Sequence, residues 1–229
     1  MAENAYYTLL TSLPHIDSLF HSKVTPISRI QLDRRLSMLS KQERDVLIRV
    51  EQLTHWSHMG TDVDENVLIR LATKLQSELP GQEIRELISW RMDVRTIIAA
   101  LRRKAQGGQA PAAGRWSFGN RYTYIRLNWN SPTLGLQHAF PWIPKVAECL
   151  SKNDHITLEK TLLGTVWHQL DILSSKHRFD FEAVIIYVLR WHLIDRWTRY
   201  NSDKALTYFR ALTDIALGDF VSQLPDCHP

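Results

Sequence analysis

Segments with helical periodicity dominate the sequence, and they restrict the possible folds more than any other feature. One of them, residues 41–54, places four apolar side chains at the i, i+1, i+4, i+7 spacing of a helix with one buried face: Val46, Leu47, Val50 and Leu53. Ser40 precedes Glu43 by three residues, a capping-box pattern that predicts where this helix begins. A chain built from such segments is predicted to be all-α.

Similar segments recur on both sides of the middle of the chain. Helices are predicted within DENVLIRLATKLQSELP, GQEIRELISWRMDVRTIIAALRRK, HITLEKTLLGTVWHQLDILSS and FDFEAVIIYVLRWHLIDRWTRY, from Pro144 onward, and after a cap-like Ser202. The clusters Trp90–Asp93–Arg95 and Trp191–Asp195–Arg196 suggest a diverged repeat of two packed bundles. We therefore expect an N-terminal helical bundle over residues 1–105 and a C-terminal helical bundle over residues 141–229.

The segment between the two predicted bundles, residues 106–140, has a different composition. AQGGQAPAAG contains three glycines and a proline but no charge, which predicts a flexible connector. RWSFGNRYTYIRLNWNSP follows and alternates aromatic with polar side chains. This pattern fits either a short hairpin or an ordered aromatic loop, and periodicity does not choose between them.

The bulk composition is that of a globular cytoplasmic protein. Of 229 residues, 44% are hydrophobic and 23% charged, a balance that excludes wholesale disorder. Cys149 and Cys227 lie too far apart for a zinc motif or a disulfide framework, so we expect reduced thiols. The N-terminus lacks the pattern of a signal peptide, and no window is apolar enough for a membrane span. Any membrane association is therefore expected to be peripheral and to depend on a partner.

Motifs of known catalytic or cofactor sites are absent from the sequence. It has neither a G-x-S-x-G nucleophile elbow nor a phosphate-binding or dinucleotide-binding glycine loop. The strongest metal candidate is HWSHMGTDVDE, residues 55–65, where His55 and His58 precede three acids. Helix physics explains this pattern without a metal, because histidines favour the last turn of a helix and acids favour the first. We predict no enzyme activity, no metal and no cofactor.

Positive charge is concentrated in one part of the chain. Residues 91–126 carry eight basic side chains against Asp93 alone, a net charge of 8 − 1 = +7 in a chain whose total is +4. Arginine and aromatic residues are enriched at protein interfaces. The side chains predicted to bind a partner are Arg91, Arg95, Arg102, Arg103, Arg115, Trp116, Phe118, Arg121, Tyr122 and Arg126.

Two other interpretations of this basic-aromatic segment remain open. It could be a structural loop, or it could bind RNA by stacking bases on the rings and pairing arginines with phosphates. The net charge of the chain is modest and no standard RNA-binding motif is present, so RNA is the alternative and a protein partner is preferred.

Two acidic residues are predicted to be structural charge clamps. On a helical wheel Asp93 falls at the edge of an apolar stripe that includes Ile97, where an unpaired carboxylate is unfavourable. We expect Asp93 to pair with an arginine or a helix terminus of the same chain. Asp195 lies in an apolar helix and is expected to pair with Arg199 or Arg190.

Several segments together resemble a known family. AYYTLLTSLPHI, SWRMDVRTIIAALRRK, RWSFGNRYTYIRLNWNSP, FPWIP and EAVIIYVLRWHLIDRW resemble a bacterial family of uncharacterised proteins encoded in operons for V-type (archaeal-like) ATPases. The operon context implies a stand-in for the C/d subunit, an all-helical socket between the membrane ring and the rotor stalk. Asp93 followed by IIAALRRK looks like one repeat unit of that socket, although the usual Asn after the Asp is replaced in the region of Thr96.

The resemblance implies a non-enzymatic accessory or central-stalk subunit that couples the rotor to the membrane sector. Its expected partners are other V-type ATPase subunits, with no small-molecule substrate and no insertion into the membrane. A socket of this kind needs a rigid helical frame and a charged surface. The apolar helical segments are of the type that forms such a frame, and the basic-aromatic segment is of the type that forms such a surface.

Overall fold

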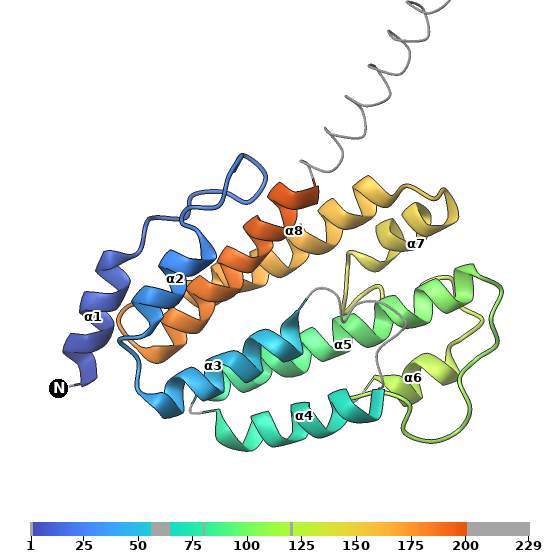
Figure 1. The fold of residues 1–229 in the computed structure, drawn as a ribbon. Coiled ribbons are helices and arrows are strands. Elements are labelled where there is room, and N and C mark those ends of the chain that lie inside the picture. The colour runs from blue at the N-terminus through green and yellow to red at the C-terminus, as the bar shows by residue number, and fades with distance from the viewer. Residues whose placement is uncertain (1, 56–64, 80, 120, 201–229) are drawn as a thin grey trace, which may run out of the picture.

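Every regular element that the structure describes is an α-helix, which confirms the predicted all-α fold class (Figure 1). The structure is a computed structural model that describes residues 2–55, 65–79, 81–119 and 121–200. Within these ranges no residue is in a β-strand. The hairpin alternative for the aromatic segment is therefore excluded there, and the segment forms a loop followed by a short helix.

The helices follow one another along the chain, with the longest connections before α2, α6 and α7. They are α1 (Ala2–Ser12), α2 (Arg29–Leu36), α3 (Lys41–Thr54), α4 (Glu65–Glu78), α5 (Gln82–Ala105), α6 (Tyr122–Leu127), α7 (Ile143–Ser151) and α8 (His155–Ser174). Residues 181–200 form a further helix, drawn in orange to red in Figure 1. None of the helices in these described stretches combines the length and the apolar character needed to cross a bilayer. The helix expected after Ser202 lies outside the described residues.

Local sequence signals set several helix boundaries. The Ser40 hydroxyl accepts a hydrogen bond from the Glu43 amide (3.3 Å), and the Glu43 carboxylate accepts one from the Ser40 amide (2.7 Å). This reciprocal pair is the predicted capping box at the start of α3. Pro144 lies in the first turn of α7, where its missing amide proton is not needed. A second capping box, Ser28 with Gln31, opens α2 and was not anticipated.

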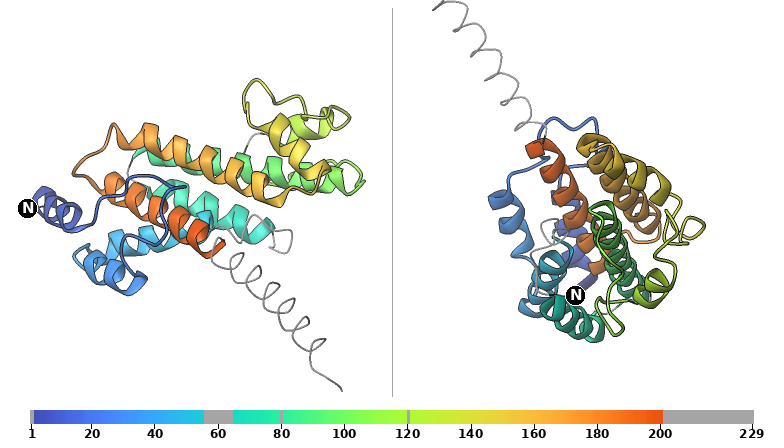
Figure 2. Two further views of the ribbon diagram at one scale, coloured as in Figure 1. Left: turned by 90° about the horizontal axis from the view of Figure 1, so that it is seen from above. Right: turned by 90° about the vertical axis from the view of Figure 1, so that its right-hand side faces the viewer.

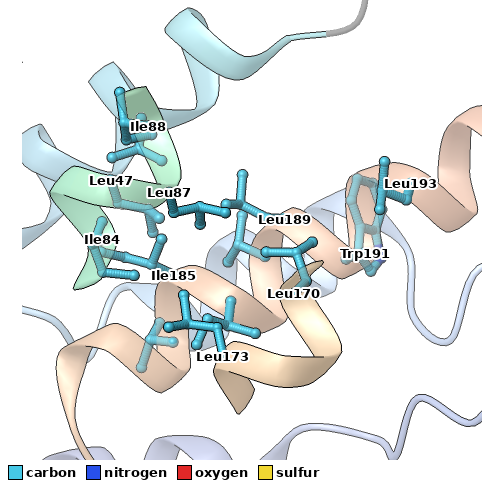
Figure 3. Packing of buried hydrophobic residues seen from close by; sticks show 14 of the residues in the cluster. Leu47, Ile84, Leu87, Ile88, Leu170, Leu173, Ile185, Leu189, Trp191 and Leu193 are labelled. Atoms are coloured by element: carbon cyan, nitrogen blue, oxygen red, sulfur yellow. The ribbon is translucent and has the colours of Figure 1, made fainter. Parts of the chain in front are cut away.

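The larger hydrophobic cluster joins helices from both ends of the sequence. Its buried side chains come from the N-terminal part of the chain up to Met92, the second half of α8 and the helix at 181–200. Figure 3 shows Ile84, Leu87 and Leu47 on one side facing Leu173, Leu170 and Leu189 on the other. The helix at 181–200 therefore packs with the N-terminal helices.

A second cluster lies around the C-terminal half of α5. It contains apolar side chains of α5 between Val94 and Leu101, Ile125 of α6, and apolar loop residues between Leu134 and Phe140. Buried side chains of α7 and α8 complete it. The two clusters mix residues from both sides of the boundaries predicted at 105 and 141. The division into sequential bundles stays a prediction. Helix α5 contributes buried side chains to both clusters.

Helix α5 is the central element of the fold. It contacts α3, α4, α6, α7 and α8, and the end-on view in Figure 2 shows it surrounded by the other helices. Its buried side chains therefore include residues on every face of the helix. Because α5 spans both clusters, it connects the two parts of the core and supports the basic-aromatic segment that follows it.

Candidate interaction site beside the long helix

One face of α5 holds residues 117–131, which contain the end of the basic-aromatic segment, in place. Asp93, Thr96 and Lys104 lie on this face, because residues three, four or eleven apart point in similar directions on a helix. Each of the three side chains contacts a different part of residues 117–131. These contacts determine which side chains of the segment remain on the surface.

The Asp93 carboxylate is largely buried, with 15% of its side chain exposed, and it lies 3.7 Å from the Arg121 guanidinium. The structure thus places an arginine of the same chain beside Asp93, the type of partner expected from the helical wheel. Gly119 also approaches Asp93 so closely that a Cβ atom at Gly119 would overlap the carboxylate oxygen. Its φ of +95° is a backbone conformation that favours glycine.

Thr96 makes the second contact. Its hydroxyl is buried and lies within hydrogen-bonding distance of the Met92 carbonyl (2.9 Å) and the Ser117 hydroxyl (2.5 Å). Ser117 is also buried, so this part of the segment enters the protein interior. Sequence reasoning missed the pairing; the position of Thr96, one turn after Asp93 on the same face, is the signal that could have indicated it.

Lys104 makes the third contact, near the end of α5. Its ammonium donates hydrogen bonds to the carbonyl oxygens of Trp129 (2.6 Å) and Ser131. Burial lowers the pKa of Lys104 from its ordinary value. The side chain is therefore used to hold the 128–131 turn against the helix, although its charge suggested a surface role.

The predicted partner-binding side chains fall into three groups. Arg103, Arg115 and Arg121 are exposed, and Arg102, Trp116, Phe118, Tyr122 and Arg126 are half-buried. Arg91 and Arg95 are only 6% and 7% exposed, and both have interaction partners within the chain. Burial therefore removes Arg91 and Arg95 from the predicted surface, because other helices pack around α5 and cover these two side chains.

Several aromatic rings of the segment are turned toward the protein. Phe118 packs against the larger hydrophobic cluster and Trp116 against the second one. The Arg115 guanidinium lies 5.6 Å from the Phe118 ring, and that of Arg121 lies 5.8 Å from the Phe140 ring. Such cation–π contacts hold the arginines near the surface.

The second predicted clamp involves Asp195 in the helix at 181–200. Its carboxylate forms an ion pair with the guanidinium of Arg199, one turn later in the same helix, at an N–O distance of 2.9 Å. Arg190, the other expected partner, pairs with Asp171 of α8 at 2.5 Å. Residues five apart point in different directions on a helix, so Arg190 is turned away from Asp195 and toward the neighbouring helix.

A cavity of about 200 Å³ lies between α3, α5, α8 and the helix at 181–200. Glu51, His192 and Arg91 line it together with leucines from the core. Burial alone would raise the pKa of Glu51, but hydrogen bonds from His192 and Arg29 outweigh it and lower the pKa. Burial lowers the pKa of Arg91 to about 9. Because this value still lies above neutral pH, the guanidinium stays protonated there.

A histidine–carboxylate cluster lies at the start of the helix at 181–200 and was not anticipated. His177, Asp180 and Glu182 bring potential metal ligands within 4.8 Å of one another. However, the two His177 nitrogens already lie 2.8 Å from Asp180 and 2.7 Å from Glu83. An imidazole with a proton on each nitrogen satisfies this arrangement. The metal candidate from the sequence, residues 55–65, lies almost entirely outside the described residues, and its His55 is the C-cap of α3.

Comparison with known proteins identifies a family without assigning it an activity. Residues 62–217 match a family described as "Protein of unknown function (DUF2764)". The match covers more than half of the chain, so the chain belongs to this family. Neither the curated proteins nor the solved structures include a significant match.

Proposed function

We propose that this protein is a non-enzymatic helical subunit of a bacterial V-type ATPase, joining the rotor stalk to the membrane sector. Two findings support the proposal. Several sequence segments resemble proteins encoded in such operons, and residues 117–131 are anchored on one face of α5. Under this proposal the chain is cytoplasmic and associates with the membrane through its partner subunits.

The observation that carries the proposal is the anchoring of residues 117–131 on α5. Asp93, Thr96 and Lys104 bind this segment from one helix face, while Arg121 within the segment and Arg115 just before it are exposed. A subunit that transmits torque must present its contact residues from a rigid frame, because loosely held contacts would move before the partner does. Anchoring a charged loop on a central helix provides that rigidity.

Affinity purification from native membranes tests the proposal. The chain is tagged at its chromosomal locus, membranes are solubilised in mild detergent, and co-purifying proteins are identified by mass spectrometry. We expect rotor-stalk and membrane-ring subunits in amounts comparable to the tagged chain. A tagged cytosolic protein of similar size and charge is the control. Recovery of the tagged chain without these ATPase subunits would count against the proposal.

A further inference from the structure

The strongest unexplained feature of the molecule is a long stretch without acidic residues. Residues 94–147 contain eight lysines and arginines and no Asp or Glu, which gives 8 − 0 = +8. The whole chain is +4, so the remaining residues sum to 4 − 8 = −4. In the structure this stretch forms the second half of α5, α6, the adjoining loops and the first turn of α7 (Figure 1).

Only some of these cations are neutralised by acids within the described part of the chain. Lys145 pairs with Glu148, and Arg121 lies 3.7 Å from Asp93. Arg103 and Arg115 are both exposed, and across the described ranges neither forms an ion pair with a carboxylate. Exposed arginines of this kind create a positive potential that attracts an anionic partner.

Helix α6 adds an apolar element to this positive surface. Its Leu127 is 71% exposed and its Tyr124 is 44% exposed. Arg121, Tyr124 and Leu127 are spaced three apart, so they lie along one side of the helix. An exposed leucine on the same side of a short helix as an exposed arginine matches the composition of protein interfaces, where an apolar anchor is surrounded by a polar rim.

We propose that the side of α6 that carries Arg121, Tyr124 and Leu127 docks an acidic amphipathic helix of a partner protein, and that the exposed Arg103 and Arg115 of the flanking segments attract it. The partner's apolar side chains would cover Leu127 and Tyr124, while its carboxylates would face the arginines. Under the proposed function, on which this inference rests, the helix belongs to another subunit of the ATPase.

The same residues favour a protein over a nucleic acid as the occupant. Binding of single-stranded RNA depends on rings with open faces, and Phe118 and Trp116 are packed against the two hydrophobic clusters. The Tyr124 hydroxyl donates a hydrogen bond to the Gly135 carbonyl (3.2 Å), which restricts the movement of that ring. An exposed leucine contributes nothing to phosphate binding but supplies an anchor for a helix.

Fluorescence anisotropy with defined probes tests the docking surface on the full chain. The probes are a labelled helical peptide with leucines on one face and glutamates on the other, a scrambled peptide of the same composition, and an oligouridylate. We expect the amphipathic peptide to bind about tenfold more tightly than the scrambled one. Tighter binding of the oligouridylate than of the amphipathic peptide would overturn the proposal in favour of a nucleic-acid surface.

Two kinds of variant separate the charged and apolar parts of the surface. Arg103→Glu/Arg115→Glu and, separately, Leu127→Ser should each weaken binding of the amphipathic peptide by about tenfold. The matched control is Arg34→Glu/Lys41→Glu, which makes the same charge change at exposed positions in α2 and at the start of α3, elements that lie on the other side of the molecule from α6 (Figure 1). If the control weakens binding as much as Arg103→Glu/Arg115→Glu does, the attraction is due to net charge and the docking surface is wrong.

Co-purification of the variants distinguishes this inference from the proposed function. If Arg103→Glu/Arg115→Glu and Leu127→Ser both retain the ATPase subunits at wild-type levels, the docking surface fails while the proposed function stands. If the wild-type chain recovers no ATPase subunit yet binds the amphipathic peptide through Leu127 and the arginines, the proposed function fails and the surface stands.

Discussion

At the scale of single residues, the Asp93 contact fixes the position of the basic-aromatic segment. The carboxylate is mostly buried, but Arg121 is 44% exposed, so the arginine can be rehydrated when its partner is removed. The loss is therefore smaller than for a fully buried ion pair, in which the remaining charge would be left without water.

Replacing Asp93 with alanine should lower the free energy of unfolding by roughly 1–3 kcal/mol, because a mostly buried carboxylate and its interaction with Arg121 are lost. Urea denaturation followed by circular dichroism measures the change. Asp17→Ala is the control, since Asp17 pairs with His15 where both side chains are more than four-fifths exposed, and it should change stability by less than about 0.5 kcal/mol. Equal stability of Asp93→Ala and wild type would mean that Asp93 is not a clamp.

Gly119 provides an independent test of the same contact. Gly119→Ala should destabilise the protein by about 1–3 kcal/mol, because the positive φ is strained for alanine and the new methyl group meets Asp93. Gly114→Ala is a matched control, because Gly114 also has a positive φ but nothing lies within 4 Å of an added Cβ. Combining Asp93→Ala with Gly119→Ala should cost less than the sum of the two changes. Strict additivity would show that the two residues do not interact.

At the scale of elements, His177 links the first turn of α5 to the start of the helix at 181–200. Its ring lies between Glu83 and Asp180, and Asp180 also accepts a hydrogen bond from the Ala183 amide (2.8 Å). Burial lowers the pKa of His177, but hydrogen bonds and charge from Asp180 and Glu83 outweigh it, so the pKa is raised above its ordinary value. The charged form of the ring is thus stabilised by folding.

This raised pKa predicts how stability depends on pH. Stability from His177 should be fully present below its unfolded pKa of about 6.5 and should be lost as pH rises through the higher folded pKa. Melting temperatures measured across this range, for wild type and His177→Gln, isolate the effect. The two proteins should differ most at the acidic end and converge at alkaline pH. A difference that grows with rising pH would contradict the proposed charge on His177.

Several elements could be predicted from the sequence because short-range signals define them. The Ser40–Glu43 capping box and Pro144 each act within one helical turn, and both mark the starts of observed helices. The aromatic segment was ambiguous because α6 has only six residues, too few for helical periodicity to be recognised. The pairing of Arg190 with Asp171 could not be predicted, since it depends on how two helices pack.

At the scale of the whole molecule, the sequence reveals the amount of charge but not which charges are buried. Arg91 and Arg103 look alike in a basic helix, yet Arg91 is buried and Arg103 is exposed. Their difference arises from the helices that pack around α5, some of them distant in sequence. For the candidate interaction site, composition therefore indicates the segment, and the tertiary structure shows which of its side chains are exposed.

The same dependence on tertiary packing makes Glu51 a test of the assembled fold. Its carboxylate, 11% exposed, pairs with Arg29 at 2.5 Å and with His192 at 2.6 Å. These contacts connect α3 to the N-terminus of α2 and to the helix at 181–200, which are far apart in the chain. Glu51→Gln should therefore lower the free energy of unfolding by roughly 1–3 kcal/mol, since the carboxylate that pairs with Arg29 and His192 is replaced by a neutral amide in a mostly buried site.

The pH dependence of this Glu51→Gln variant identifies the cause of the loss. Because the pKa of Glu51 is lowered, its contribution should be present above the ordinary carboxyl pKa of about 4.3 and lost as pH falls through the lower folded pKa. The difference between wild type and Glu51→Gln should therefore shrink in acid. Asp33→Asn, which removes an exposed partner of the same Arg29, should change stability by less than about 0.5 kcal/mol. A gap between wild type and Glu51→Gln that is independent of pH would attribute the loss to packing and not to charge.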